Sequence, residues 1–369
     1  MARNGAAGGA PGVRLLLVNF VMDQSSPVLA WQQGVVTRLA ERCERVVVLT
    51  ERVVASPLPA NVEVHRVPRI LTTPLRMLGV RWLMNIPVWR WCARERFDAV
   101  FVHMNADWVY RLAPCWRRFR VPVLLWYAHG SVTRRLHRAH AHASCVITST
   151  PEGFRIPSPK VRVIGQGVDT DLFVPAANRP DTATIVAVGR VSRRKRVDLM
   201  LESLAWLKTH APQLPFTLRI IGPTLTRDDE RYAEELEQMA SASGLRGAVT
   251  FEGPLPVDRL PQIYASSFLH LNLSETGSMD KAILESLASG LPTLTSNEAA
   301  FAVLRDFPGL QVRQRTPDAI GEQIRRVYET RHAFSPIALR QLVEGQHDLN
   351  SYAERVCTIL AELATRKAA

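Results

Sequence analysis

The stretch between positions 271 and 296, LNLSETGSMDKAILESLASGLPTLTS, has the pattern of an anion-binding turn. The apolar run from Phe268 to Leu273 predicts a buried strand, and a polar turn with Gly277 and Ser278 follows it. A helix comes next in this prediction, with Met279 on its packed side. Free backbone N–H groups at the start of such a helix suit an anion, so the sequence predicts an anion site here.

A carboxylate follows this turn in the predicted helix. Glu285 is expected about two turns into the helix, on the face that looks back towards the bound group. A carboxylate so near a phosphate suits the hydroxyl groups of a sugar or ribose better than the phosphate itself. The segment therefore predicts a pocket for a nucleotide sugar, although many strand-to-helix turns bind nothing.

A second, cationic segment lies well upstream, in TIVAVGRVSRRKRVDLMLESL. It begins with an apolar strand, turns at Gly189 and enters a helix near Asp198. Five of the seven residues between positions 190 and 196 are basic, which is typical of a solvated charge run or a nucleic-acid patch. We favour a phosphate site, because Arg190 and Lys195 follow a parallel strand and can donate to phosphate oxygens.

Together with other motifs, these segments resemble the retaining glycosyltransferases of family 4, over nearly everything from Val13 to about Ala364. The resemblance implies the GT-B fold, an α/β architecture in which two Rossmann-like parallel-sheet domains face each other across a cleft. In that family an Arg and a Lys in a GR-x4-K arrangement hold the donor diphosphate, and Gly189, Arg190 and Lys195 match it. The segment SLASGLP follows Glu285, which matches the family's ribose-binding Glu.

Three further blocks carry the resemblance. FEGPLPVDRLPQIYASS matches the part of the family whose backbone contacts the nucleotide base, and WYAHGS places His129 near the transferred sugar. STPEGFRIPSPKVRVIGQGVDTDLF matches the crossing between domains. The resemblance implies catalytic roles for His129, Arg190 and Lys195. It also implies that the donor contacts Gly189, Arg190, Lys195, Gly222, Pro254, Leu255, Gly277, Ser278, Met279, Asp280, Lys281 and Glu285.

Two departures from the family pattern leave assignments open. The family has an acid eight residues before the ribose-binding Glu, and this chain has Gly277 there. Either Asp280 or Glu275 is expected to take over the sugar contact. Many members also have a Gly-Gly pair after the first strand, where this chain has MDQSSPVLAWQQG. Ser25 and Ser26 there either contact a phosphate or sugar, or cap a helix that starts just after them.

Length and composition predict two domains. A chain of 369 residues that is 47% hydrophobic can bury two cores. Strands alternate with helical stretches in both halves, which is typical of parallel α/β sheets. The predicted strands are Arg14–Phe20, Arg45–Thr50, Ala99–Val102, Val121–Trp126, Ser144–Thr148, Thr184–Val188, Thr217–Ile221, Val249–Phe251, Ser267–Leu273 and Thr293–Thr295.

The domain limits follow from breaks in this pattern. Residues 1–12 are rich in Gly and Ala and are expected to form a disordered tail. Residues 13–174 are predicted to form an acceptor-side Rossmann-like domain, and residues 175–350 the nucleotide-sugar-binding one. Two prolines mark the break near 173–181. By the resemblance, a last helix within 351–369 crosses back to complete the first domain.

Positive charge is concentrated in the first half. Up to Val174 the chain has 23 basic and 11 acidic residues, whereas the rest has 23 of each. Such a field favours an anionic membrane surface or a negatively charged acceptor. The segment from Pro74 to Arg96 interleaves tryptophans with arginines, as in an interfacial helix or in a helix packed on a sheet. We expect a cytoplasmic protein, at most peripheral on the inner face of the cytoplasmic membrane, with no nucleic-acid partner.

Membrane-spanning and metal-binding classes find little support. The longest charge-free run in that segment, Trp82 to Trp89, has eight residues, whereas a span takes roughly 20. The five cysteines are scattered without a CxxC pair, which predicts reduced thiols. Asp169-Thr170-Asp171 looks like a metal-binding DxD motif, but a turn at the end of the first domain explains it better. No metal is expected.

The resemblance implies transfer of a sugar from a nucleoside-diphosphate sugar to a glycan or lipid-linked acceptor, with retention of anomeric configuration. No cofactor or divalent cation is expected, because Arg190, Lys195 and the N–H groups between positions 277 and 280 would stabilise the leaving diphosphate. His129 would orient the sugar or the incoming hydroxyl. Two alternatives remain: a nucleotide-sugar epimerase with the same fold, and a catalytically silent nucleotide-sugar-binding protein.

Overall fold

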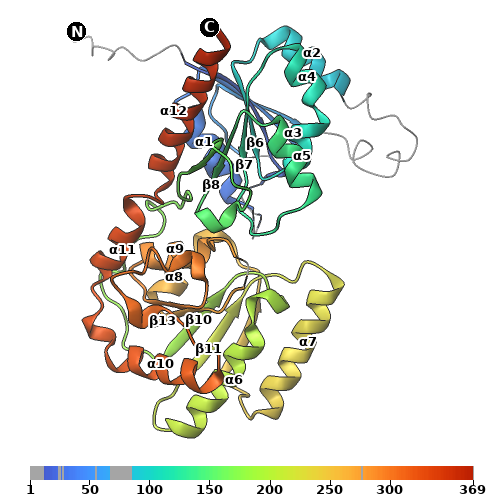
Figure 1. Ribbon diagram of the computed structural model, residues 1–369. Coiled ribbons are helices and arrows are strands. Elements are labelled where there is room, and N and C mark those ends of the chain that lie inside the picture. The colour runs from blue at the N-terminus through green and yellow to red at the C-terminus, as the bar shows by residue number, and fades with distance from the viewer. Residues whose placement is uncertain are drawn as a thin grey trace, which may run out of the picture.

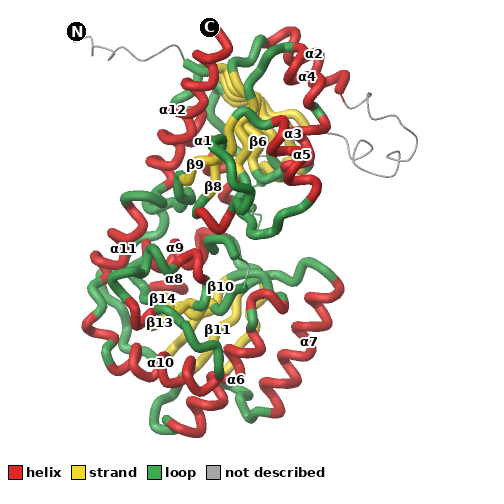
Figure 2. The backbone as a smooth tube through the Cα atoms, viewed as in Figure 1, coloured by secondary structure: helices red, strands yellow, loops and turns green. Residues whose placement is uncertain are grey.

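The chain forms two parallel sheets, each covered by helices, which build an upper and a lower domain in Figures 1 and 2. The predicted α/β class with two parallel-sheet domains is confirmed. This computed structural model describes residues 12–23, 26, 29–54, 56–66, 85–275 and 277–368. The predicted tail, apart from Gly12, and residues 74–84 of the segment 74–96 therefore lie outside the described residues.

The N-terminal sheet has seven parallel strands in the order β5-β3-β1-β6-β7-β8-β9. Successive side chains of its central strand point to opposite faces, with Leu15 and Leu17 in one core and Leu16 and Val18 in the other. Because both faces are covered, the central strands read as continuous apolar runs. The strands span Arg14–Val18 (β1), Arg45–Thr50 (β3), Val62–Arg66 (β5), Ala99–His103 (β6), Val123–Trp126 (β7), Cys145–Thr148 (β8) and Val161–Val163 (β9).

Helices cover both faces of this sheet. Helix α1 (Trp31–Ala40) packs on the face that holds Leu15 and Leu17. The opposite face is covered by α2 (Asn85–Glu95), α3 (Ala106–Arg111), α4 (Ala113–Arg118) and α5 (Arg134–His142). A separate two-stranded ladder joins β2 (Val21–Met22) to β4 (Arg52–Val53).

The C-terminal sheet has five parallel strands in the order β12-β11-β10-β13-β14, and one continuous core binds it to its helices. The strands span Thr184–Val188 (β10), Thr217–Ile221 (β11), Val249–Gly253 (β12), Leu269–Asn272 (β13) and Thr293–Thr295 (β14). The helices span Val197–His210 (α6), Arg227–Ala242 (α7), Leu260–Ala265 (α8), Lys281–Ala288 (α9), Pro317–Glu329 (α10) and Pro336–Glu344 (α11). Short 3₁₀ turns cover Pro151–Gly153 (η4), Arg193–Lys195 (η5), Val257–Arg259 (η6), Glu298–Ala300 (η7), Pro308–Leu310 (η8) and Arg331–Ala333 (η9).

The last helix, α12 (Leu349–Ala368), returns to the N-terminal domain, where Figure 1 shows it beside α1. Its Tyr352 ring packs edge-on against Trp126, with the ring centroids 5.3 Å apart. The segment 164–173 makes the other crossing between the domains. Gly167 in this segment lies so close to α12 that an added Cβ would come within 2.8 Å of the Leu349 side chain. The two crossings therefore lie side by side.

Most differences from the predicted strands concern the residues at which strands begin or end, and the strands at the edges of the sheets. β3, β10, β11 and β14 have the predicted bounds, whereas β1 ends at Val18 rather than at Phe20. The structure adds the edge strands β5 and β9, whose sequences VEVHR and VRV alternate apolar with charged residues. The N-terminal sheet ends at Val163 and the C-terminal sheet begins at Thr184, so the predicted break near 173–181 falls between the two sheets.

Two smaller features bear on the class of protein. Across the described parts of the chain, no helix combines the length and the apolarity that a membrane crossing needs. All five cysteines are free thiols, and four of them are buried.

Candidate functional site

A cleft of about 680 Å³ lies between the two domains, at the carboxyl ends of strands from both sheets. Strand β7 brings His129 to it, β10 brings Arg190, and α9 brings Glu285. Parallel sheets bind ligands at this edge. The predicted residues that line the cleft are Ser26, His129, Gly189, Arg190, Lys195, Gly222, Pro254, Leu255, Ser278, Met279, Asp280, Lys281 and Glu285.

Arg190 is held in place by a carboxylate that the sequence analysis missed. Its Nε and Nη2 atoms lie 2.8 and 2.7 Å from Asp229 Oδ2. Asp229 closes the capping box at the start of α7, where its side chain also accepts from the backbone N–H of Thr226. Burial alone would raise the pKa of Asp229, but backbone N–H donors and the Arg190 guanidinium bring it below its ordinary value. The spacing of Thr226 and Asp229 is the sequence signal for this capping box.

Lys195 has a carboxylate partner of its own. Its Nζ lies 2.5 Å from Asp280 Oδ2, which also accepts from Asn272 Nδ2 at 3.1 Å. Asp280 is the N-cap residue of α9, yet its side chain accepts no capping bond from the helix, so it is directed to Lys195. Burial would raise the pKa of Asp280, but the Lys195 ammonium lowers it below the ordinary value. Arg190 and Lys195 are therefore both preorganised by acids, of which Asp229 is buried and Asp280 partly buried.

Two glycines let the backbone of β10 and β11 come together beside these cations. Gly189 and Gly222 have φ values of +144° and +150°, a region that favours glycine. A Cβ added to Gly222 would lie 1.9 Å from the carbonyl oxygen of Gly189. Position 222 therefore accepts only glycine, and the close approach of the two strands that it permits shapes the cleft beside Arg190.

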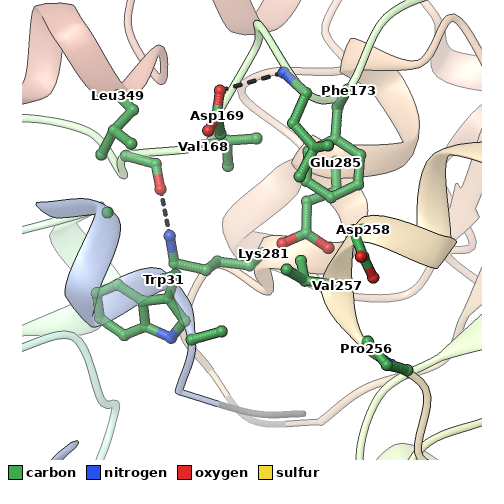
Figure 3. Close-up of a pocket in the computed structure, with 14 residues that line it drawn as sticks. Trp31, Val168, Asp169, Phe173, Pro256, Val257, Asp258, Lys281, Glu285 and Leu349 are labelled. Carbon is green, nitrogen blue, oxygen red and sulfur yellow. Dashed lines mark hydrogen bonds between the residues drawn. The ribbon is translucent and has the colours of Figure 1, made fainter. Parts of the chain in front are cut away.

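Lys281 and Glu285 lie one turn apart on α9, and Figure 3 shows the Lys281 side chain extending towards Trp31. Lys281 Nζ donates to the carbonyl oxygen of Gly167 in the crossing segment and lies 4.2 Å from the ring centroid of Trp31 on α1. Burial raises the pKa of Glu285 to about 7, although the ammonium beside it acts in the opposite direction. Burial lowers the pKa of Lys281 to about 8. Glu285 lies only one turn into α9, not two, because the helix starts at Lys281.

His129 lies on the N-terminal side of the cleft in a fixed orientation. Its backbone N–H donates to Gly153 O at 2.8 Å, and its Nδ1 accepts from the Ser131 N–H at 3.1 Å. The neutral ring therefore carries its proton on Nε2. Burial and the nearby Arg194 lower the pKa of His129, which keeps the ring neutral at physiological pH.

The structure separates the two acids between which the sequence could not choose. Asp280 lines the cleft, whereas Glu275 does not: its Oε1 lies 3.0 Å from Arg196 Nη1 and 3.8 Å from Arg315 Nη1. Gly277 also lies outside the residues that line the cleft, in a left-handed conformation with a φ of +64°.

The serines after the first strand give a partial result. Ser25 lies outside the described residues. Ser26 lines the cleft, and its Oγ accepts from the Leu29 N–H at 3.2 Å. Helix α1 begins at Trp31, later than predicted, so Ser26 caps a turn ahead of the helix rather than the helix itself. Ser26 is thus held by its own turn beside the cleft.

The metal-like Asp169-Thr170-Asp171 motif acts as a turn. Asp169 Oδ1 accepts from the N–H groups of Asp171 and Leu172, both at 3.1 Å. Thr170 donates to Asp348 Oδ2 at 2.7 Å, which ties the two crossing segments together. Among the residues that the structure describes, no three His, Cys, Asp or Glu side chains gather as metal ligands would.

The comparison with known protein families concerns the C-terminal domain. A family described as "Glycosyl transferases group 1" matches residues 182–330, which contain Arg190, Lys195 and Glu285. A phosphatidylinositol N-acetylglucosaminyltransferase chain of Arabidopsis thaliana is 26% identical over 53% of this chain and 42% of its own length. D-inositol 3-phosphate glycosyltransferase of Acidothermus cellulolyticus is 31% identical over 37% of this chain and 33% of its own. The matches thus cover less than half of these relatives.

Solved structures match almost the whole chain. Anabaena HepE in complex with UDP superposes with a TM-score of 0.72 at 17% identity, over 95% of this chain and 100% of that one. WaaG, a glycosyltransferase involved in lipopolysaccharide biosynthesis, gives a TM-score of 0.69 at 16% identity, over 94% and 99%. At such identities the likeness establishes the fold. Residues 182–330 are thus similar to the family of glycosyl transferases group 1, and the two facing domains have the GT-B fold.

Proposed function

We propose that the protein is a retaining glycosyltransferase that takes a sugar from a nucleoside-diphosphate sugar and passes it to a glycan or lipid-linked acceptor without a metal ion. One observation carries the proposal. Arg190, Lys195, Asp280 and Glu285 of the C-terminal domain line the same cleft as His129 of the N-terminal domain. A phosphate site, a hydroxyl-binding acid and a neutral imidazole thus face one space.

The cations would act on the leaving group. When the bond between the anomeric carbon and the diphosphate oxygen breaks, negative charge collects on the β-phosphate. Arg190 and Lys195 are fixed in advance by Asp229 and Asp280, so they need little reorganisation to stabilise that charge. The acceptor hydroxyl attacks the anomeric carbon from the same face, and its proton passes to the departing phosphate oxygen. These two cations supply the positive charge that a divalent metal supplies elsewhere.

The remaining residues would position the donor and the acceptor. Glu285 would accept hydrogen bonds from the ribose hydroxyls, and the backbone at Pro254 and Leu255 would contact the base. Asp280, while it keeps its contact with Lys195, would accept hydrogen bonds from hydroxyls of the transferred sugar. The neutral His129, with its proton on Nε2, would orient the sugar or the attacking hydroxyl.

An anionic membrane surface is the second partner that we propose, on the strength of one face of the N-terminal domain. Exposed arginines on or just after its helices are Arg90, Arg94, Arg96, Arg117, Arg118, Arg120, Arg134, Arg135 and Arg138. The one acid in the described parts of α2, α4 and α5 is Glu95, which is buried. Trp89 is 37% exposed on α2 and suits the interface of a bilayer. This face would hold the enzyme beside a lipid-linked acceptor.

Donor binding and turnover test the proposal. Thermal shifts with UDP-, GDP- and ADP-sugars identify the donor, because a ligand stabilises in proportion to its occupancy. Arg190→Ala is expected to lose roughly 2–4 kcal/mol of transition-state stabilisation, as for loss of an oxyanion donor. The control is Arg193→Ala, because Arg193 belongs to the same segment but pairs with Glu235 outside the cleft. Near-normal turnover by Arg190→Ala would contradict the proposal.

The product separates the remaining alternatives. A retaining transferase gives a glycoside whose anomeric configuration, read by NMR coupling constants, equals that of the donor. If activity survives EDTA, metal independence is supported. If EDTA abolishes activity and only a divalent ion restores it, metal independence is contradicted. Conversion of the nucleotide sugar with no acceptor present would favour an epimerase. Donor binding with no release of diphosphate under any acceptor would favour a silent binding protein.

A further inference from the structure

A second cavity, of about 450 Å³, lies within the N-terminal domain. Four neighbouring strands mark its floor: Glu51, Met104 and Tyr127 each come directly after a strand, and Phe20 follows two residues after β1. The cavity therefore sits at the carboxyl edge of β1, β3, β6 and β7, where a parallel sheet binds ligands. It lies outside the donor residues described above.

This cavity adjoins the donor cleft. Met104 lines both of them, and its φ of +67° is unusual for a residue with a side chain. Such strained backbone is commonly found beside functional sites. Tyr127 of the cavity lies with its ring centroid 6.4 Å from that of His129. A molecule in the cavity can therefore present a hydroxyl to His129 and to the donor.

Two arginines in the cavity share a single carboxylate. Arg111 Nη2 donates to Asp107 Oδ2 at 2.9 Å, and Arg135 Nη1 lies 3.8 Å from the same oxygen. They come from α3 and α5, which pack side by side (Figure 1). The Arg135 side chain is 67% exposed and only loosely paired. One carboxylate cannot occupy the forks of two guanidinium groups, so N–H donors remain for a phosphate.

The opposite wall is suited to hydroxyl groups. Asn105 occupies the N-cap position of α3 but makes no capping bond. Its Nδ2 instead donates to Glu51 Oε1 at 3.3 Å, so the amide and the carboxylate together face the cavity. Tyr127 donates its hydroxyl to Ser131 O at 2.9 Å and leaves its ring as part of the lining. The cavity thus combines acceptors for hydroxyls on one side with cations on the other.

We propose that this cavity binds the acceptor, and that the acceptor is a polyhydroxylated ring with a phosphate monoester or diester held by Arg111 and Arg135. The inference rests on the proposed glycosyl transfer and adds the chemical class of the acceptor. Glu51 and Asn105 orient the ring hydroxyls, and the phosphate fixes the end of the ring away from His129.

The test uses matched pairs of probes that differ by one phosphate: glucose with glucose 6-phosphate, and inositol with inositol 1-phosphate. Calorimetry measures their binding in the presence of the nucleoside diphosphate that stabilises the protein most, so that the donor phosphate site is occupied and no turnover is needed. We expect the phosphorylated member of at least one pair to bind roughly tenfold or more tightly, as for hydrogen bonds to a charged group. Arg135→Gln is expected to remove this preference.

The control variant is Arg138→Gln, because Arg138 is exposed on the same helix and does not line the cavity. Unchanged thermal midpoints show that both variants fold. Equal binding of both members of every pair, or equal losses in the two variants, overturns the acceptor class. If neutral acceptors are glycosylated and Arg135→Gln is fully active, the anion site is wrong while the proposed transfer stands.

A second arm distinguishes a free sugar phosphate from a lipid headgroup. Vesicles of phosphatidylcholine with phosphatidylinositol present the same ring and phosphate as a diester in a bilayer. If the acceptor is lipid-linked, diphosphate release is stimulated by these vesicles and falls more in Arg135→Gln than in Arg138→Gln, because both arginines belong to the basic face but only Arg135 lines the cavity. If it is soluble, only the sugar phosphates stimulate release. Stimulation by neither source, together with no binding of any phosphorylated probe, rejects the inference.

Discussion

Position 277 is glycine because two parts of the chain approach each other there. A Cβ on Gly277 would lie 3.1 Å from Arg155 Nη2 of the N-terminal domain, and its φ of +64° disfavours any side chain. Its carbonyl oxygen would lie 3.2 Å from a Cβ added to Gly130, which follows His129. The left-handed backbone, together with this close approach, therefore disfavours the acid that the resemblance places at this position. Asp280, three residues on, lines the cleft instead.

Asp280→Asn is therefore expected to lower kcat/KM for the donor, whereas Glu275→Gln is expected to leave it nearly unchanged. The change removes the counterion of Lys195 and a charged partner for sugar hydroxyls, an effect of about 1.5–3 kcal/mol. Steady-state release of nucleoside diphosphate measures it. Glu275 is the matched control because its ion pairs with Arg196 and Arg315 lie outside the cleft. If Glu275→Gln lowered kcat/KM more than Asp280→Asn, Glu275 would be the residue that contacts the sugar.

The Lys281–Glu285 pair predicts a pH dependence of donor binding. The pKa of Glu285 is raised to about 7, so below that pH the folded protein carries the protonated acid, which binds ribose hydroxyls less well. Donor affinity is expected to fall as the pH drops through 7. Lys281→Met removes the ammonium that lowers this pKa, so the midpoint is expected to move to higher pH.

Calorimetry of nucleoside-diphosphate binding between about pH 6 and pH 8 measures this midpoint. Glu285→Gln is the control, because it keeps an acceptor oxygen but does not titrate, and any remaining pH dependence belongs to the phosphate or to Lys281. A midpoint that does not move in Lys281→Met would show that the two groups are not coupled.

At the scale of elements, Gly290 determines how α9 ends. Its φ of +68° is left-handed, and an added Cβ would lie 2.6 Å from Pro336 Cβ at the start of α11. Gly290→Ala is expected to cost about 1–3 kcal/mol, since the backbone strain and the clash both act against the folded state. Urea unfolding followed by circular dichroism measures the loss.

Gly345→Ala is the comparison for this variant, because position 345 is helical and nothing lies within 4 Å of the added Cβ. It is expected to be neutral or slightly stabilising. If the two variants were equally stable, α9 and α11 would have shifted to accept the added Cβ without loss of stability.

The sequence predicts elements well where one physical signal dominates. Apolar runs identify β3 and β10 at their true bounds, because strands that are covered on both faces are largely apolar. The bounds of β11 are also predicted, although Arg219 interrupts its apolar run. Edge strands β5 and β9 carry charged residues on their open side, so no run marks them. The spacing of Arg190, Lys195 and Glu285 predicts the cations and the acid that the structure brings to one cleft.

What the sequence could not predict are contacts between distant segments. Lys281 donates to Gly167 O, 114 positions away, and packs over Trp31 of the other domain. Asp229 holds Arg190 from 39 positions away. The contacts of Lys281 depend on how the two domains meet, and the Arg190–Asp229 pair depends on how β10 and α7 are placed within one domain. No local pattern encodes either arrangement.

At the scale of the whole molecule, the basic face predicts salt-sensitive binding to anionic vesicles. About 1 kcal/mol is gained for each basic residue near such a surface. Replacing Arg117 and Arg118 by Gln is therefore expected to lower partitioning by roughly thirtyfold. Co-sedimentation with phosphatidylglycerol vesicles, compared with phosphatidylcholine alone, measures this.

The matched control replaces Arg227 and Arg231, two exposed arginines of the C-terminal domain, by Gln. It changes net charge equally but leaves the basic face intact. Equal losses in both double variants would show that net charge, rather than this face, governs binding. No binding by the unaltered protein at low salt would remove the membrane from the proposed partners.

The return of α12 to the N-terminal domain has a consequence for biosynthesis. Tyr352, Val356 and Leu360 belong to the same apolar cluster as Leu15 and Val35, although they are translated more than 300 codons later. While the ribosome is still making the C-terminal domain, the nascent first domain must leave that face uncovered. The order of translation thus delays completion of this core until α12 has been made and can dock.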